Sequence, residues 1–212
     1  MSSRTEICNI ALSHIGTAKP ISDLDTGEGT EAVVCRRFYE TSLKQYLREF
    51  AWPFAKRERT LALIEENPND EWNYSYRYPS DVLMIGRIYS GVRNDSRQSR
   101  APYLVASDDT GKLIYTDQEN ACIWYTKYNN DPQTYPQDFI FAFSYLLAWY
   151  ISPALTKGDP FKIRRELIQA FRQSSSMAKA NALNEEQAEE NVVSEFERDR
   201  EGIFREETPW RW

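Results

Sequence analysis

The chain contains one histidine, His14, so an imidazole is available for acid–base chemistry at one place only. A Ser–His–Asp triad would have to use this residue. His14 falls in the last turn of a short helix that the sequence predicts, where a partial positive charge is favourable in any case. We therefore expect His14 to have a structural role.

Asp25-Thr26-Gly27 matches the three letters of the aspartic protease motif, in which two carboxylates share a proton. Asp23, Asp25 and Glu28 also resemble fragments of a calcium-binding loop, although the twelve-residue ligand pattern is absent. Both matches lie in a loop between two predicted helices, where Asp, Thr and Gly serve as turn and capping residues. Turn and capping chemistry is the interpretation that we favour here.

Carboxylates elsewhere could in principle form the acid–base pair of a glycosidase, with candidates at Glu65, Glu66, Asp70 and Asp81. Because the chain has 32 acidic residues, some such pair is always available and the observation identifies no site. The phosphate-binding patterns GxxxxGK(S/T) and GxGxxG do not occur, and no His, Cys and carboxylate group has zinc spacing. We expect no catalytic, cofactor-binding or metal-binding residues.

The cysteines Cys8, Cys35 and Cys122 are odd in number and far apart in the sequence. They form neither a CxxC pair nor a disulfide framework, which is typical of a reducing compartment. Cys8 and Cys35 lie on apolar faces of predicted helices, so we expect them to act as small core residues.

The formal net charge of −6 is unevenly distributed. Residues 184–212 contain ten acidic and four basic residues, which accounts for the whole excess, and the rest of the chain is balanced. A general nucleic-acid-binding surface needs clustered Lys and Arg, so the composition argues against one.

The strongest helical pattern runs from Thr30 to Lys56, where apolar residues recur at steps of three and four. It predicts a helix to about Ala51, because Pro53 cannot continue it, with Trp52 and Phe54 presented at the exit. A shorter helix precedes it, beginning at a capping box and ending at Gly16. The capping box consists of Ser3 and Glu6.

Between Arg57 and Pro132 the helical period disappears, and short β-branched and aromatic runs alternate with turn residues. This pattern predicts an antiparallel sheet or small barrel. The expected strands are Thr60–Ile64, Trp72–Tyr78, Val82–Tyr89, Tyr103–Ala106, Lys112–Thr116 and Ala121–Tyr128.

Helical signals return with residues 137–155, which are apolar almost all round and therefore expected to lie buried between neighbours. The run is short of the roughly 20 residues of a membrane span, and the N-terminus lacks the pattern of a secretion signal. Asp159 and Pro160 then start a further helix, which we expect Ser174–Ser176 to weaken. Asn184 either caps one more helix, or the helix continues.

These elements predict an α+β fold: a four-helix bundle-like α domain with an inserted antiparallel β-sheet or barrel domain and an extended C-terminal tail. The helical domain comprises residues 1–56 and 134–184, the β domain residues 57–133, and the acidic extension residues 185–212.

The acidic extension carries large apolar residues on a segment too polar to join a core. Aromatic residues on such an extension commonly anchor in a pocket of a partner protein. The alternatives are a tail folded back on its own bundle and a disordered tail. The expected partner-binding residues are Phe196, Ile203, Phe204, Trp210 and Trp212.

Several of these segments together resemble a known protein family. ICNIALSHIG, the loop ISDLD and EAVVCRRFYETSLKQYLREFAWPFAKR are similar to the opening of the head-to-tail adaptor proteins of tailed bacteriophages, called tail tubular protein A in short-tailed phages. Tyr78-Pro79-Ser80-Asp81 and the following Val82-Leu83 resemble the family's P-x-D-(Y/V)-L step in the β region. Tyr135-Pro136-Gln137-Asp138-Phe139 resembles the start of its third helix.

The resemblance implies a non-enzymatic structural protein of the virion, located in the tail or neck and assembled in the host cytoplasm. Such adaptors form dodecameric rings beneath the portal protein, extend the DNA channel and carry the tail nozzle. The implied partners are the portal, the nozzle protein, further copies of the chain, and double-stranded DNA that passes through without specific binding. No cofactor and no membrane are implied.

Two alternatives remain open. Some relatives of adaptors have been credited with hydrolysis of cell walls or polysaccharides, which would require a carboxylate pair, most plausibly in the β domain. The other is a helical interaction protein that binds a partner through residues 196–212. A turnover assay distinguishes the first from an adaptor, and ring stoichiometry with portal binding distinguishes the second.

Overall fold

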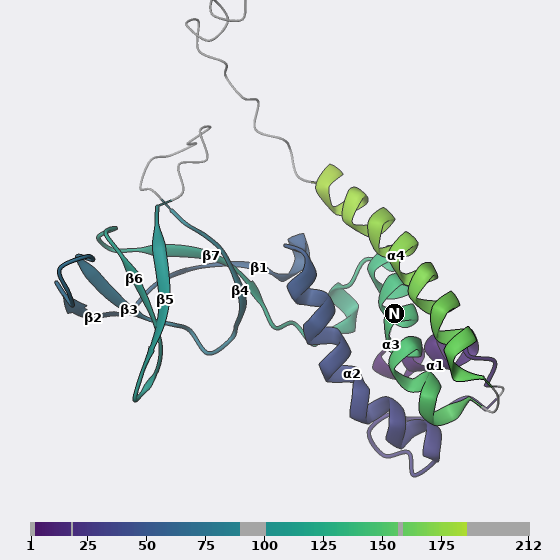
Figure 1. The fold of residues 1–212 in the computed structure, drawn as a ribbon. Helices are drawn as coiled ribbons and strands as arrows, with labels where there is room; N and C mark the ends of the chain where they lie inside the picture. Colours follow the sequence, from purple (N-terminus) through teal and green to yellow (C-terminus); the bar gives the residue numbers. More distant parts are fainter. Residues whose placement is uncertain (1–2, 18, 90–100, 157–158, 186–212) are drawn as a thin grey trace, which may run out of the picture.

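The structure is a computed structural model that describes residues 3–17, 19–89, 101–156 and 159–185. Over these residues it contains four α-helices and two antiparallel sheets, so the fold class is α+β (Figure 1). The acidic extension from residue 186 onward lies outside the described residues. The helices are α1 (Arg4–His14), α2 (Thr30–Glu49), α3 (Gln137–Leu155) and α4 (Pro160–Asn184).

Helix α3 is the centre of the helical part and packs against α1, α2 and α4. Its side chains Phe139, Phe143 and Leu147 have no exposed area, as expected of a core helix. By length and composition alone α3 could cross a membrane, but the core helices of soluble proteins share these properties. Within the protein, 56% of its most apolar 18 residues are buried.

The predicted boundaries of α1 are confirmed. Ser3 Oγ accepts a hydrogen bond from the Glu6 amide at 3.1 Å, and the Ser3 amide donates to Glu6 Oε2 at 3.3 Å. Gly16 has φ +75°, a left-handed conformation that glycine adopts without steric cost.

Helix α2 ends at Glu49, two residues before the predicted end, because Phe50 already has extended backbone. A short 3-10 turn, η1 (Pro53–Ala55), follows Trp52. Trp52 is 1% exposed and donates from Nε1 to the Tyr46 carbonyl oxygen at 3.2 Å. The aromatic exit is therefore folded back onto the end of the helix.

Helix α4 is continuous from Pro160 to Asn184, so the expected weakening at Ser174–Ser176 is wrong. Serine competes with the backbone only weakly, and Ser175 is 3% exposed, so tertiary packing holds this turn. The start is as predicted: the Asp159 side chain accepts from the Phe161 amide at 2.9 Å.

The two sheets have the strand orders β1-β7-β4 and β2-β3-β6-β5, and every neighbouring pair is antiparallel. The predicted strand Thr60–Ile64 is wrong, because the chain changes sheets there: the Leu61 amide donates to the Ala121 carbonyl, and the Ala62 carbonyl accepts from the Arg77 amide. The strands are β1 (Lys56–Thr60), β2 (Leu63–Glu66), β3 (Tyr74–Arg77), β4 (Val82–Ile88), β5 (Tyr103–Asp108), β6 (Gly111–Thr116) and β7 (Cys122–Lys127).

The sheets share a small core of their own, separate from the helical core. Tyr76 and Ile114 come from the four-stranded sheet, and Ile88 and Ile123 from the three-stranded one. Helix α2 contacts the β part through β4.

Candidate functional site

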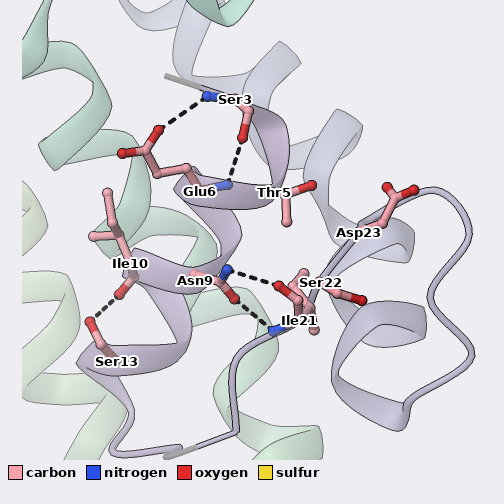
Figure 2. Close-up of a pocket in the computed structure, with 9 residues that line it drawn as sticks. All are labelled: Ser3, Thr5, Glu6, Asn9, Ile10, Ser13, Ile21, Ser22 and Asp23. Atoms are coloured by element: carbon pink, nitrogen blue, oxygen red, sulfur yellow. Dashed lines mark hydrogen bonds between the residues drawn. The ribbon is translucent and has the colours of Figure 1, made fainter. Parts of the chain in front are cut away.

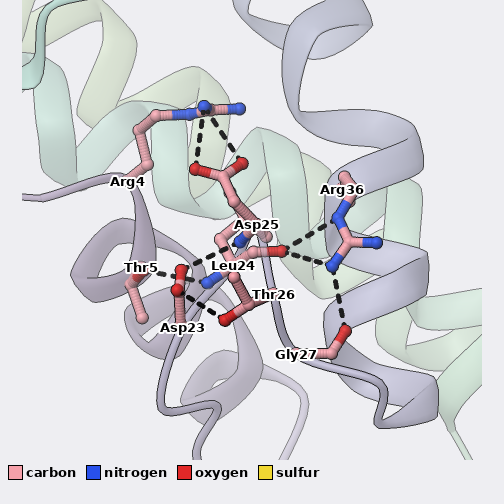
Figure 3. A network of polar contacts seen from close by, with 8 residues as sticks. All are labelled: Arg4, Thr5, Asp23, Leu24, Asp25, Thr26, Gly27 and Arg36. Atoms are coloured by element: carbon pink, nitrogen blue, oxygen red, sulfur yellow. Dashed lines mark hydrogen bonds and ion pairs between the residues drawn. The ribbon is translucent and has the colours of Figure 1, made fainter.

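Residues 19–29 connect α1 to α2 and contain the aspartic protease-like tripeptide. Asp23 accepts hydrogen bonds from the Asp25 amide at 2.9 Å and from Thr26 Oγ1 at 2.6 Å, and Asp25 forms an ion pair with Arg4 at 3.3 Å (Figure 3). The hydrogen bond from Thr26 lowers the pKa of Asp23. A shared proton needs a raised carboxyl pKa, so the preferred interpretation as turn and capping chemistry agrees with this geometry.

The same loop is fastened to α2 by a guanidinium fork. Arg36 donates from Nε and Nη2 to the Leu24 carbonyl oxygen at 2.9 and 2.8 Å, and from Nη2 to the Gly27 carbonyl oxygen at 2.9 Å (Figure 3). Gly27 fits closely here, because a Cβ atom at this position would lie 2.5 Å from the Asp23 carbonyl oxygen. Sequence reasoning did not find this role of Arg36, since an arginine on the polar face of a helix, next to Arg37, does not indicate which carbonyl groups it will bind.

On the α1 side the loop is held by side chains that bind its backbone. Asn9 donates from Nδ2 to the Ile21 carbonyl oxygen at 3.0 Å and accepts from the Ile21 amide at 2.9 Å, and the Leu24 amide donates to Thr5 Oγ1 at 3.1 Å. Asn9 thus pairs with Ile21 as a neighbouring strand would. The loop is consequently fixed to both helices along its length.

An open depression of about 700 Å³ lies between α1 and this loop (Figure 2). Two of its serines already form hydrogen bonds: Ser3 caps α1, and Ser13 Oγ donates to the Ile10 carbonyl oxygen at 2.6 Å. A wide, polar, shallow surface of this kind suits contact with another macromolecule better than enclosure of a small substrate. The lining residues are Ser3, Thr5, Glu6, Asn9, Ile10, Ser13, Ile21, Ser22 and Asp23.

His14 is the last residue of α1, and its side chain packs against α3. Its ring stacks on Tyr145 with the centroids 3.9 Å apart, and its Nε2 lies 3.0 Å from Ser144 Oγ. Because Ser144 donates its own proton to the Phe141 carbonyl oxygen, Ser144 Oγ accepts from a protonated Nε2. Burial lowers the pKa of His14, so the neutral ring is favoured, and the expected stabilisation of a positive charge at the helix end is not what holds it.

The fold brings Cys8 and Cys35 together, although 26 residues separate them in the sequence. Both thiols are free and have no exposed area, as expected of core residues. A hydrogen bond with Cys35, together with burial, raises the pKa of Cys8 well above its usual range. Such a thiol is a poor nucleophile.

The four glycosidase candidates are divided between the two sheets. Glu65 and Glu66 are exposed on β2 and Asp70 follows in the next turn, whereas Asp81 precedes β4. Asp81 accepts from the Tyr125 hydroxyl at 3.1 Å and lies 3.7 Å from Arg59. Over the part of the chain that the structure describes, no group of three or more His, Cys, Asp or Glu side chains is placed to hold a metal ion.

The predicted partner-binding residues Phe196, Ile203, Phe204, Trp210 and Trp212 lie outside the described residues, so their role stays a prediction. Other large apolar side chains are exposed, on two strands at opposite edges of one sheet. Leu63 and Ile64 on β2 are 49% and 44% exposed, and Leu104 and Val105 on β5 are 48% and 43% exposed. Sequence reasoning missed this surface, because an unbroken apolar run is equally typical of a strand buried on both faces.

Comparison with known proteins returns no match for this chain, either among family models or among curated proteins.

Proposed function

We propose that the protein is a head-to-tail adaptor of a tailed bacteriophage that forms a ring beneath the portal. In this role it extends the DNA channel and carries the tail nozzle. The proposal begins from the sequence resemblance and is supported by where the resembling segments lie in the fold.

The observation that carries the proposal is one aromatic cluster in which two of those segments meet, the one that contains α2 with its exit and the one that starts α3. Trp52 and Phe54 of the helix exit lie 4.9 Å from Phe139, which belongs to the segment that starts α3 (ring centroids). Tyr135 of the same segment lies 5.4 Å from Phe54, and Tyr46 of α2 stacks on Phe139 at 4.8 Å. These two resembling segments therefore pack against each other in the helical core, which supports the proposal.

Another resembling segment lies at the start of β4, the strand that contacts α2. Asp81 of the Tyr-Pro-Ser-Asp step is bound by Tyr125, and its carbonyl oxygen accepts from the Tyr128 amide at 3.2 Å. Tyr128 in turn lies under Lys44 of α2, with the ammonium 4.8 Å from the ring centroid. Two of the resembling steps, at Trp52 to Ala55 and at Tyr135 to Phe139, thus lie where the chain passes between its helical and β parts, and the step at Tyr78 to Leu83 lies between β3 and β4.

The balanced charge outside the acidic extension agrees with a conduit for DNA, because tight phosphate binding would impede passage. The open polar depression and the exposed strand edges agree with a protein that works through contacts to other proteins. The acidic extension is assigned to docking on the portal, through the apolar residues predicted from its sequence.

The test is native mass spectrometry of the full chain alone, then mixed with the portal protein encoded in the same genome. We expect a species that becomes dodecameric on the portal ring, and a loss of this assembly in a variant that lacks residues 185–212. The same preparation assayed on peptidoglycan and capsular polysaccharide should show no turnover. If the protein does not bind the portal, the proposal is overturned. Turnover of either polysaccharide substrate would favour the hydrolase alternative.

A further inference from the structure

The four-stranded sheet ends in two strands that are paired on one side only within the described residues. β2 pairs with β3, and β5 pairs with β6. Both strands expose large apolar side chains, the pair Leu63–Ile64 on β2 and the run Tyr103–Val105 on β5. An exposed apolar edge is a template for pairing with another strand.

The edges of the two sheets differ in how well they are protected against such pairing. β1 reads Lys-Arg-Glu-Arg-Thr, and charged residues blunt an edge. β4 has two register shifts, which have the same effect, and β2 has one, at Ile64. β5 is in regular register with β6 over its whole length, from Tyr103 to Asp108, so it is the edge best suited to receive a strand.

Strand direction and register both fit β2 of another copy that lies alongside in the same orientation. Because every neighbouring pair is antiparallel, β2 and β5 of one sheet run in opposite directions. A second copy placed alongside in the same orientation therefore brings its β2 antiparallel to β5. Leu63 pairs with Tyr76, Tyr76 with Ile114, and Ile114 with Val105, so continuing this row places Leu63 of one copy beside Val105 of the other.

Charge also agrees with this arrangement. In the antiparallel pair the end of β2, where Glu65 and Glu66 are exposed, meets the beginning of β5. The sequence that leads into β5, residues 91–100, contains three arginines and one aspartate. Charge is therefore compatible with this pairing, but it does not select it over β5 with β5, in which the start of one strand would meet Asp108 of the other.

We propose that β5 of one copy pairs with β2 of the next, so that the four-stranded sheets join copy to copy. The contact uses two different edges, and a heterologous contact of this kind generates a closed ring when the rotation closes. The inference deepens the proposed function, on which it rests for the ring, and assigns the surface that links neighbouring subunits.

The test is cross-linking between two full-length variants, each with one introduced exposed cysteine, mixed with the portal. One is an affinity-tagged Leu63→Cys and the other an untagged Val105→Cys, both with Cys122→Ser, because Cys122 is partly exposed whereas Cys8 and Cys35 are not. A thiol cross-linker of about 8 Å tolerates a shift of one or two residues in register, at roughly 3.4 Å per residue. We expect the tagged–untagged dimer as the major product, with loss of most of the monomer.

The matched control mixes Val105→Cys with Leu183→Cys, which places an exposed thiol on α4 instead of β2. Cross-linking no greater than in this control, while native mass still shows a ring on the portal, would overturn the strand pairing and leave the adaptor function intact. Dominant dimers of Val105→Cys with itself would also overturn it, in favour of a two-fold pairing of β5. Tagged–untagged dimers without any assembly on the portal would support the pairing and overturn the adaptor function instead.

Discussion

The hydrogen bonds of Arg36 make a prediction about how residues 19–29 are held. Replacing Arg36 by Ala removes three hydrogen bonds of 2.8–2.9 Å to the carbonyl oxygens of Leu24 and Gly27. A hydrogen bond from a charged donor contributes about 1.5–3 kcal/mol when buried. Arg36 is exposed, so water replaces part of what is lost, and we expect the variant to lose about 1–2 kcal/mol of unfolding free energy.

The neighbouring Arg37 provides the matched control, since it lies on the same helix and is exposed. Arg37→Ala makes the same change in charge and in helix propensity, so we expect it to change the unfolding free energy by less than about 0.5 kcal/mol. Arg36→Lys should fall between the two, because an ammonium group lacks the planar fork that binds two carbonyls at once.

Two measurements check this prediction. Thermal unfolding followed by circular dichroism should show a melting temperature about 2–8 °C lower for Arg36→Ala, at about 2–4 °C per kcal/mol for a chain of this size. Hydrogen exchange by mass spectrometry should show faster exchange confined to the peptide that covers residues 19–29, by roughly tenfold for each 1.4 kcal/mol. If Arg36→Ala melts and exchanges like Arg37→Ala, the loop is held by Asn9 and Thr5, and the reasoning is refuted.

Two further predictions concern the core and its pH dependence. Trp52→Ala should destabilise the protein by about 3–5 kcal/mol in urea unfolding, because it empties the centre of the aromatic cluster, whereas Trp52→Phe should cost about 1 kcal/mol for the lost hydrogen bond; equal effects would contradict this. Burial lowers the pKa of His14 below its ordinary value of 6.5, so the unfolded chain takes up a proton first as the pH falls, and stability is lost below about pH 6.5 until the folded pKa is reached. His14→Gln should reduce the stability difference between pH 7.5 and 5.5, and an unchanged difference would show that other groups cause it.

Much of the helical fold could be predicted from the sequence, because local signals and tertiary packing agree there. The Ser3–Glu6 capping box, the left-handed Gly16 and the Asp159 cap are each specified by residues within one turn of where they act. The mistakes arose where packing overrode local preference. Ser174–Ser176 lies within a continuous helix because Ser175 packs inside the protein.

The β part was predicted less well, because pairing depends on residues far apart in the sequence. β1 has no apolar alternation, so no pattern indicated a strand, and it exists because its backbone pairs with β7 along its whole length. The division into two sheets follows from the crossing at Leu61 and Ala62, which hydrogen bonds to distant strands define.

The features that could carry function were the least predictable of all. Predicting that Arg36 binds carbonyl groups, or that β5 is exposed, requires knowledge of which elements become neighbours. Neither feature is marked by a characteristic residue spacing in the sequence. The aromatic residues could be recognised in the sequence as separate motifs, but their packing around Phe139 could not be predicted from it.

The packing of these aromatic side chains around Phe139 affects how the proposed ring of subunits would close. In a heterologous assembly the same rotation relates each copy to the next. If the angle between the helical and β parts of the subunit varied, the assemblies would have many different sizes or would not close. Here the chain leaves the helical part through Trp52 and Phe54 and returns to it through Tyr135. The aromatic side chains of all three lie with their centroids within 5.4 Å of another aromatic side chain of the cluster. Aromatic packing of this kind fixes orientation as well as separation. If the proposed adaptor ring forms, native mass spectrometry of Trp52→Ala with the portal should show a broader distribution of assembly sizes than the unchanged protein, even at temperatures where the variant stays folded.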